Sequence, residues 1–167
     1  MNKTMLAMLL LGVATGARAE GTVVIPAEVP FSNPDVIDGA IVKECQLPQQ
    51  VGQRLQTALA AAGVEAKAVA DAKPGSGDEV LLLEIAQAQS GGNAWTGHKK
   101  SLTVSGKLYR KGEQVAKFVA TRNSGGGAFA GYKGSCAVLA RCAEAIAKDT
   151  AGWLKSPVDG ARLGDAR

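Results

Sequence analysis

The apolar residues of this chain follow a helical period in two stretches. In the first stretch they recur every three or four positions, at Leu47, Val51, Leu55, Ala58, Leu59 and Ala62. Pro48 suits the first turn of such a helix and Gly63 suits its end. The second stretch runs from Ala137 to Lys155, and its apolar stripe is Leu139, Cys142, Ile146 and Trp153. The pattern therefore predicts two amphipathic helices.

A two-residue period predicts the strands. Residues 64–70, 102–108 and 115–121 alternate between apolar and polar positions, as half-buried strands do. Residues 80–85 are the strongest strand candidate. Because the start of this run is apolar on both faces, we expect it to be the central strand of the sheet. Residues 40–43 are predicted as a short strand that leads into the first helix. Residues 23–25 are a further candidate, suited to the edge of a sheet.

These elements predict an α+β fold, with two helices packed on one face of a mixed four- to five-stranded sheet. The expected order is roughly β-α-β-β-β-β-α. Residues 40–155 form the single α+β domain in this interpretation. Residues 20–39, rich in Pro, Asn and Asp, are expected to be an irregular leader, and residues 156–167 a flexible tail.

Residues 1–19 have the features of a secretory signal peptide. Lys3 supplies a positive charge, residues 5–13 form an apolar run too short to span a bilayer, and Ala17 and Ala19 precede a cleavage site at Glu20. A buried N-terminal helix is the alternative. No cysteine follows the cleavage site, which argues against lipoprotein processing. We therefore expect a periplasmic or secreted protein with no integral membrane segment after cleavage, because no second long apolar run follows.

Charge excludes one class of partner. The whole chain carries a net charge of +4. Removing the 19-residue segment, which holds Lys3 and Arg18, leaves 148 residues with about +2. This charge is spread along the chain, whereas a nucleic-acid-binding protein concentrates basic residues in a stripe or patch. We expect no nucleic-acid partner.

Three cysteines make one disulfide and one remaining thiol the expected arrangement for an exported protein. Cys142 lies on the apolar stripe of the second helix, whereas Cys45 and Cys136 each precede a helix. A Cys136–Cys142 bridge is disfavoured if both are helical, because six residues of helix separate their Cα atoms by ~9 Å. The sequence therefore favours a Cys45–Cys136 disulfide, with Cys142 as a small buried residue.

The segment from Gln89 to Lys100 is the favoured contact surface. It is long for a hairpin connection and concentrates Trp95, the single histidine His98, Lys99 and Lys100. An aromatic residue in a polar loop is a typical recognition anchor. The alternative is that the Trp95 ring folds back on the sheet. One histidine without clustered partners predicts neither a metal site nor a catalytic triad.

The glycine-rich segment 123–134 resembles a nucleotide-binding loop only superficially. Gly125, Gly127 and Ala130 match the loose dinucleotide spacing, but the required strand and acidic residue do not follow the helix. A phosphate-binding loop is also excluded, because Tyr132 stands after Gly131 where a lysine is needed. The glycines suit close backbone approach. Alternatively, Phe129 and Tyr132 anchor a loop that becomes ordered on a partner.

Two features give the chain a family resemblance. A Ser-Gly-Gly-Gly-Ala-Phe run at residues 124–129 precedes a final helix ending in Trp153-Leu154. Glu44-Cys45 before the first helix pairs with Gly134-Ser135-Cys136 before the last. In these respects the chain resembles small exported bacterial envelope proteins, and through them the α/β domain of curli-secretion-type lipoproteins, over residues 40–155. It departs from those lipoproteins in lacking a cysteine at the cleavage site.

The resemblance implies an accessory or assembly role in the cell envelope and carries over no catalytic residue. The first functional hypothesis is therefore a soluble periplasmic binding module, acting through loops or a sheet edge, with another envelope protein as its partner. No cofactor or metal is expected. The alternative is a small thiol-dependent enzyme that uses Cys136 or Cys142 together with His98.

Overall fold

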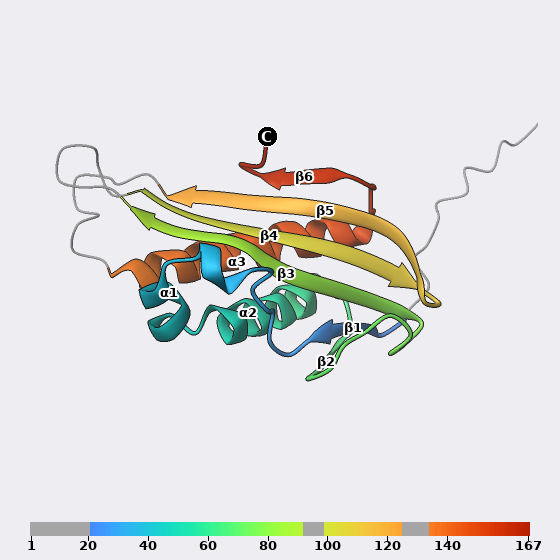
Figure 1. Cartoon of the computed structure of the whole chain (residues 1–167). Helices are drawn as coiled ribbons and strands as arrows, with labels where there is room; N and C mark the ends of the chain where they lie inside the picture. Colours follow the sequence, from blue (N-terminus) through green and yellow to red (C-terminus); the bar gives the residue numbers. More distant parts are fainter. Residues whose placement is uncertain (1–20, 92–98, 125–133) are drawn as a thin grey trace, which may run out of the picture.

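The computed structural model describes residues 21–91, 99–124 and 134–167 (Figure 1). Within these residues, six strands form one mixed sheet in the order β2-β1-β3-β4-β5-β6. The elements are, in chain order, β1 (Val23–Pro26), the short 3-10 helix η1 (Pro34–Val36), α1 (Gly39–Glu44), α2 (Leu47–Ala61), β2 (Ala66–Val69), β3 (Glu79–Gly91), β4 (Lys99–Arg110), β5 (Glu113–Ser124), α3 (Ser135–Lys155) and β6 (Ala161–Gly164).

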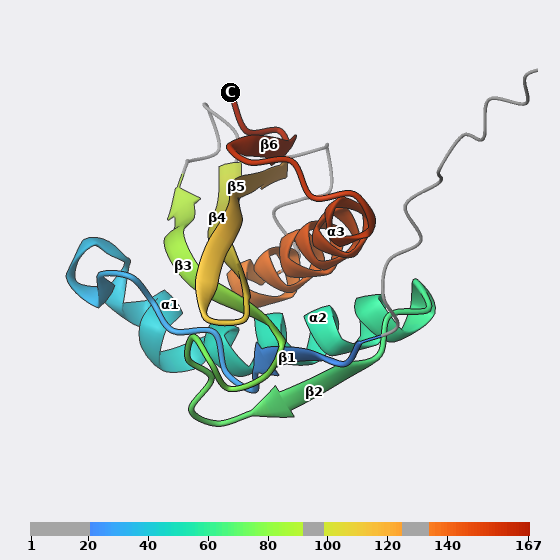
Figure 2. The same cartoon turned by 90° about the vertical axis from the view of Figure 1, so that its right-hand side faces the viewer.

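The long strands β3, β4 and β5 form an antiparallel meander, and the short strands extend it on both sides. Strand β1 is parallel to both β2 and β3, and β6 is parallel to β5. The sheet bends so that α2 and α3 lie together on its inner side (Figure 2). The outer face of β3, β4 and β5 is left without a covering helix in both views. The α+β class and the two packed helices agree with the sequence, whereas the sheet has more strands than expected.

The core lies between the inner face of the sheet and the two long helices. Phe118 of β5 is 1% exposed, and its ring centroid lies 4.7 Å from that of Trp153 on α3. Gly106 of β4 is directly opposite Phe118 in the register, and a Cβ at that position would overlap the Phe118 ring. Gly52 likewise lets α2 approach the chain after β1, since a Cβ there would overlap the carbonyl oxygen of Ala27.

The segment predicted as a strand at residues 40–43 is helical, so that prediction was wrong. Asp38 accepts a hydrogen bond from the backbone N–H of Ala40 at 2.8 Å, which caps helix α1. Ile41 is buried on its inner side, while Val42 and Lys43 are more exposed. Four residues hold too little periodicity to distinguish a strand from one helical turn, and the cap decides the outcome here.

The segment expected to be an irregular leader contains an interior strand. Residues Val23–Pro26 lie between β2 and β3, and all four are buried. The prediction of an edge strand there was therefore wrong about its position. The run Val-Val-Ile-Pro has no alternation because both of its faces are covered, which is typical of a parallel interior strand.

The C-terminal segment is also structured, contrary to the expectation of a flexible tail. Strand β6 pairs with Phe118–Thr121 of β5. Two aspartates at its ends accept hydrogen bonds from the open edge of β5: Asp159 from the N–H of Lys117 and Asp165 from the N–H of Asn123, at 2.9 and 2.8 Å. These carboxylates satisfy backbone donors that an uncovered edge strand leaves unpaired.

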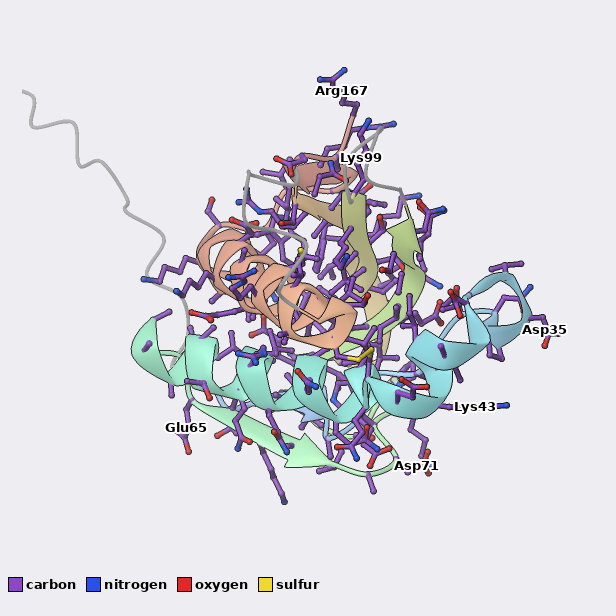
Figure 3. All side chains as sticks on the ribbon, turned by 90° about the vertical axis from the view of Figure 1, so that its left-hand side faces the viewer. Asp35, Lys43, Glu65, Asp71, Lys99 and Arg167 are labelled. Atoms are coloured by element: carbon purple, nitrogen blue, oxygen red, sulfur yellow. A yellow bond between two sulfur atoms is a disulfide. The ribbon has the colours of Figure 1, made fainter. Side chains whose placement is uncertain are left out.

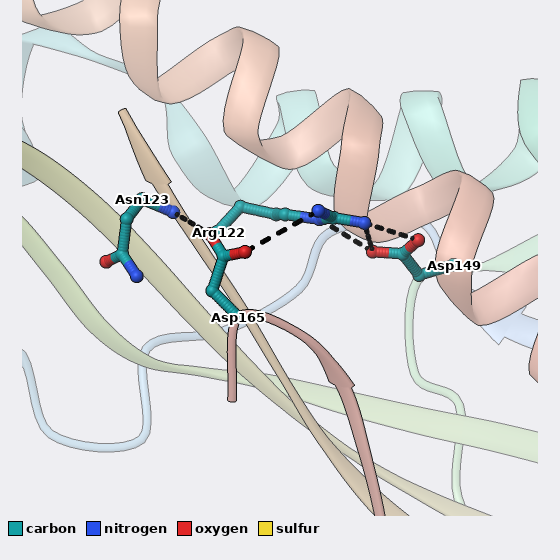
Figure 4. Close-up of polar contacts among 4 residues, drawn as sticks. All are labelled: Arg122, Asn123, Asp149 and Asp165. Atoms are coloured by element: carbon teal, nitrogen blue, oxygen red, sulfur yellow. Dashed lines mark hydrogen bonds and ion pairs between the residues drawn. The ribbon is translucent and has the colours of Figure 1, made fainter. Parts of the chain in front are cut away.

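Arg122 ties β6 to the rest of the fold (Figure 4). Its guanidinium donates two hydrogen bonds, both 2.8 Å long, to the carboxylate of Asp149 on α3. It also forms an ion pair with Asp165 at 3.8 Å. The bidentate geometry is the stronger form of arginine–carboxylate contact. One side chain thus connects the last strand, the meander and the final helix.

Candidate functional site

The predicted contact residues belong to one end of the molecule, which we call the loop-bearing end. Here β3 ends at Gly91, β4 begins at Lys99, β5 ends at Ser124 and α3 begins at Ser135. The register places Gly91 opposite Lys99, and Lys100 between Ser90 and Ser124. Figure 3 looks onto this end, with Lys99 labelled. Trp95, His98, Phe129 and Tyr132 lie outside the described residues.

The two neighbouring lysines of this end have different environments. Lys99 is exposed, whereas Lys100 is only 7% exposed. Lys100 shares its side of β4 with Leu102 and Val104, both fully buried, because alternate residues of a strand point to the same face. The sequence prediction treated both lysines as parts of one solvated surface. The alternation Lys100, Leu102, Val104 was the signal that could have separated them.

A cavity of about 660 Å³ opens at the loop-bearing end. It lies between the ends of β3, β4 and β5 on one side and the start of α1 on the other. Its lining combines both lysines with small polar side chains and one exposed valine: Val36, Asp38, Ala88, Gln89, Ser90, Gly91, Lys99, Lys100, Ser101, Asn123 and Ser124. The contributions of Asp38, Ser90 and Ser124 were not predicted from the sequence, because their proximity depends on strand pairing and on the position of α1.

A disulfide connects the two helices of this end. Cys45 at the end of α1 is bonded to Cys136 in the first turn of α3, with their Cα atoms 4.9 Å apart (Figure 3). This is the pairing expected from the sequence. The side-chain amide of Gln50 donates a 2.7 Å hydrogen bond to the carbonyl oxygen of Cys45. The cross-link therefore holds α1, one wall of the cavity, against the start of α3.

A second contact fixes α3 to the sheet at the same end. The hydroxyl oxygens of Ser90 and Ser135 lie 2.7 Å apart, so one hydroxyl donates to the other. Ser90 is the penultimate residue of β3, and Ser135 is the first residue of α3. The beginning of the helix is thereby held beside Lys100, which is the cross-strand neighbour of Ser90.

Cys142 is the free cysteine of the chain, and it is buried in the helix–sheet core. Burial raises the pKa of its thiol above the ordinary value, and the nearby charge of Arg141 opposes this effect. Since the thiolate is the reactive form, both burial and the raised pKa disfavour nucleophilic chemistry. Cys136 is held in the disulfide. Neither cysteine of the alternative hypothesis therefore has the environment of a catalytic thiol.

We expect a thiol reagent at pH 8 to leave the oxidised native protein unmodified and to label one thiol per molecule after denaturation. The reason is that Cys142 becomes accessible only when α3 leaves the sheet. A titration with a chromogenic disulfide measures both values, and Cys142→Ala is the control that abolishes the signal. Rapid labelling of native protein would contradict the assignment of Cys142 as an inert core residue.

Two further properties of the described residues concern metal binding and membrane insertion. Among residues 21–91, 99–124 and 134–167, no group of three or more His, Cys, Asp and Glu side chains is arranged to hold a metal ion. No helix in the same residues is long and apolar enough to cross a membrane.

Comparison with known proteins gives structural neighbours only. No family model matches the chain, and no curated protein matches it significantly in sequence. A Xanthomonas campestris protein of the DUF330 family is 10% identical and superposes with a TM-score of 0.57 over 89% of this chain and 91% of its own.

Two further neighbours superpose less well. The PelC dodecamer of Paraburkholderia phytofirmans is 14% identical, with a TM-score of 0.49 over 81% of this chain and 93% of its own. A minor lipoprotein of Acinetobacter baumannii is 11% identical, with a TM-score of 0.46 over 82% and 94%. At these identities the likeness to the Xanthomonas protein shows a common fold, and nothing about activity follows from it.

Proposed function

We propose that this protein is an exported, non-catalytic accessory module of the bacterial cell envelope that binds its partner through the loop-bearing end. The observation that carries the proposal is the cavity beside Lys99 and Lys100, at the end where the Trp95 segment begins and ends. The disulfide and the Ser90–Ser135 contact make this end a rigid frame. Binding residues on loops held by a rigid scaffold are a common arrangement.

Three lines support the envelope part of the proposal. The signal-peptide features of residues 1–19 predict export. A disulfide that closes a long loop suits an oxidising compartment, where such bonds persist. The short motifs at residues 124–129 and around Cys45 and Cys136 resemble those of exported envelope proteins. In the proposed setting the protein begins at Glu20 and lies in the periplasm or outside the cell. N-terminal sequencing of a periplasmic extract tests this, and intact Met1 in a cytoplasmic fraction would contradict it.

The binding part predicts that the Trp95 ring is an exposed anchor. We expect iodide to quench strongly the fluorescence of a Trp153→Phe variant, in which Trp95 is the remaining tryptophan. The matched control is Trp95→Phe, in which Trp153 remains. Trp153 is 7% exposed and donates its indole N–H to the carbonyl oxygen of Val158, so iodide should quench it little.

Equally weak iodide quenching of the fluorescence of both variants would contradict the prediction that Trp95 is exposed. In that case Trp95 packs on the protein itself. Trp95→Ala would then lower the melting temperature and leave partner binding per folded molecule unchanged. If the anchor is real, Trp95→Ala weakens partner binding more than Lys99→Ala does, because a buried aromatic anchor contributes more than a charge at an interface rim.

A further inference from the structure

Lys100 is the least explained side chain of the loop-bearing end. It is 93% buried, since 7% of its surface is exposed, and it lines the cavity. No hydrogen bond or ion pair joins its ammonium group to any residue that the structure describes. Its ammonium nitrogen is not among the fully buried side-chain atoms that lack a partner, so the stem is buried while the ammonium group reaches the cavity. The position therefore suits an anion that is not part of the described chain.

The neighbours of Lys100 favour the same kind of ligand. Ser90 and Ser124 are its direct cross-strand neighbours, so their hydroxyls lie on the same face of the sheet. In the Ser90–Ser135 pair one hydroxyl donates to the other, and the second hydroxyl keeps its hydrogen for another acceptor. Hydroxyl and ammonium donors thus gather in one cross-strand row.

The start of α3 adds a positive partial charge to this row. Its N-cap residue is Gly134, which makes no side-chain cap, so the first backbone N–H groups of a 21-residue helix have no side-chain acceptor. Ser135, the first residue, is hydrogen-bonded to Ser90 beside Lys100. A helix N-terminus and an ammonium group repel each other, and an anion between them removes this repulsion.

The cavity offers room for such an anion together with the molecule that carries it. Its volume of about 660 Å³ lies within the usual range for small-molecule sites. Asp38 is the carboxylate in its lining, and this group is already engaged as the cap of α1 through the N–H of Ala40. Lys99 adds a second cation at the rim. Positive charge therefore dominates the lining.

We propose that the cavity at the loop-bearing end binds a phosphate group, with Lys100 as its buried counter-ion and Ser90 and Ser124 as hydroxyl donors. A tetrahedral oxyanion has enough acceptor oxygens for the ammonium and both hydroxyls at once. This inference deepens the proposed function, on which it rests, because it names the chemistry recognised at the same end of the molecule. The phosphate belongs either to a free phosphorylated small molecule or to a lipid headgroup.

The test is a titration of the oxidised protein with inorganic phosphate. Amide chemical shifts are recorded by NMR at each phosphate concentration, and chloride keeps the ionic strength constant. We expect saturable shifts at Ser90, Lys100 and Ser124. The Lys100→Met variant, which keeps the length of the side chain and removes its charge, should bind at least ~10-fold more weakly, the size of one buried charge-assisted contact. Lys107→Met is the matched control, because Lys107 is exposed on the same strand and does not line the cavity, and it should bind within about twofold of the unmodified protein.

Lys100→Met is compatible with folding, because the Lys100 ammonium group has no partner among the described residues and the apolar stem of the side chain is retained. Ser124→Ala is the second variant, and a loss of about threefold or more is expected for one hydroxyl donor. Two results overturn the proposal: no saturable shift in the unmodified protein, or equal affinity in Lys100→Met and Lys107→Met. Neither result affects the export and Trp95 quenching experiments, which test the proposed function separately.

Vesicle binding distinguishes the two sources of phosphate. Vesicles of phosphatidylglycerol in phosphatidylcholine should bind the protein in a Lys100-dependent manner if the ligand is a headgroup. If the ligand is a free phosphorylated molecule, vesicle binding is absent or identical in Lys100→Met, while the shifts with inorganic phosphate still depend on Lys100. Lys100-dependent vesicle binding in addition to the Lys100-dependent phosphate shifts assigns the phosphate to a headgroup.

Discussion

Removing the disulfide should produce one of the two largest losses of stability in this protein. We expect Cys45→Ser to lower the free energy of unfolding by about 4 kcal/mol. The cross-link joins residues separated by 91 positions, and in the chain-entropy model a loop of that length contributes ~4–5 kcal/mol. Cys45 is 2% exposed, so the serine hydroxyl also enters an apolar environment. Urea denaturation followed by circular dichroism measures the change.

Two further variants make this prediction specific to the bond. The double variant Cys45→Ser with Cys136→Ser should be about as stable as either single variant, because all three lack the same cross-link. Cys142→Ala, which leaves the disulfide intact, should lose much less. A loss below about 1 kcal/mol for Cys45→Ser, or additive losses in the double variant, would show that the disulfide does not hold this fold together.

The second large effect is expected at Phe118. Replacing it with alanine should cost about 3–5 kcal/mol, the usual range for deleting a fully buried aromatic ring. The ring is 1% exposed, contacts Trp153 and covers Gly106. Its neighbour Val119 is 43% exposed on the opposite face of β5, so Val119→Ala is the matched control and should cost well under half as much.

Gly106 allows the same packing to be tested from the other side. Gly106→Ala should destabilise the unmodified protein by about 1–3 kcal/mol, because the added Cβ overlaps the Phe118 ring. In a Phe118→Ala background the same change should cost much less, since the ring is gone. Independent, additive effects in this double-mutant cycle would contradict the direct contact between β4 and β5 at this position.

Hydrophobic periodicity predicted the long helices and strands correctly. The stripe containing Val51 and Leu55 predicted α2, and the stripe containing Leu139 and Ile146 predicted α3, because each helix is four or more turns long and buries one face. The three long strands were also recognisable. Residues 102–108 and 115–121 alternate because one face covers the core, and residues 80–85 form a continuous apolar run whose start is buried on both faces. The Cys45–Cys136 pairing followed from the same stripes, which left Cys142 alone on a buried face.

Short elements were decided by their neighbours. Strand β6 has four residues, and its formation depends on β5 and on the contacts of Asp159 and Asp165. Strand β1 is equally short, and its interior position depends on β2 and β3 being available on both sides. A four-residue segment carries too few positions for its pattern to reveal its partners.

The candidate site shows the same division. The sequence by itself determined the two long helices, the three long strands, the favoured disulfide and a polar loop segment ending in Lys99 and Lys100. Only the tertiary structure decided that Lys100 is buried between Ser90 and Ser124, that Ser135 approaches it from α3, and that Asp38 closes the cavity. The reason is physical: periodicity reports which face of an element is buried, whereas the meeting of side chains from separate elements depends on strand register and helix placement.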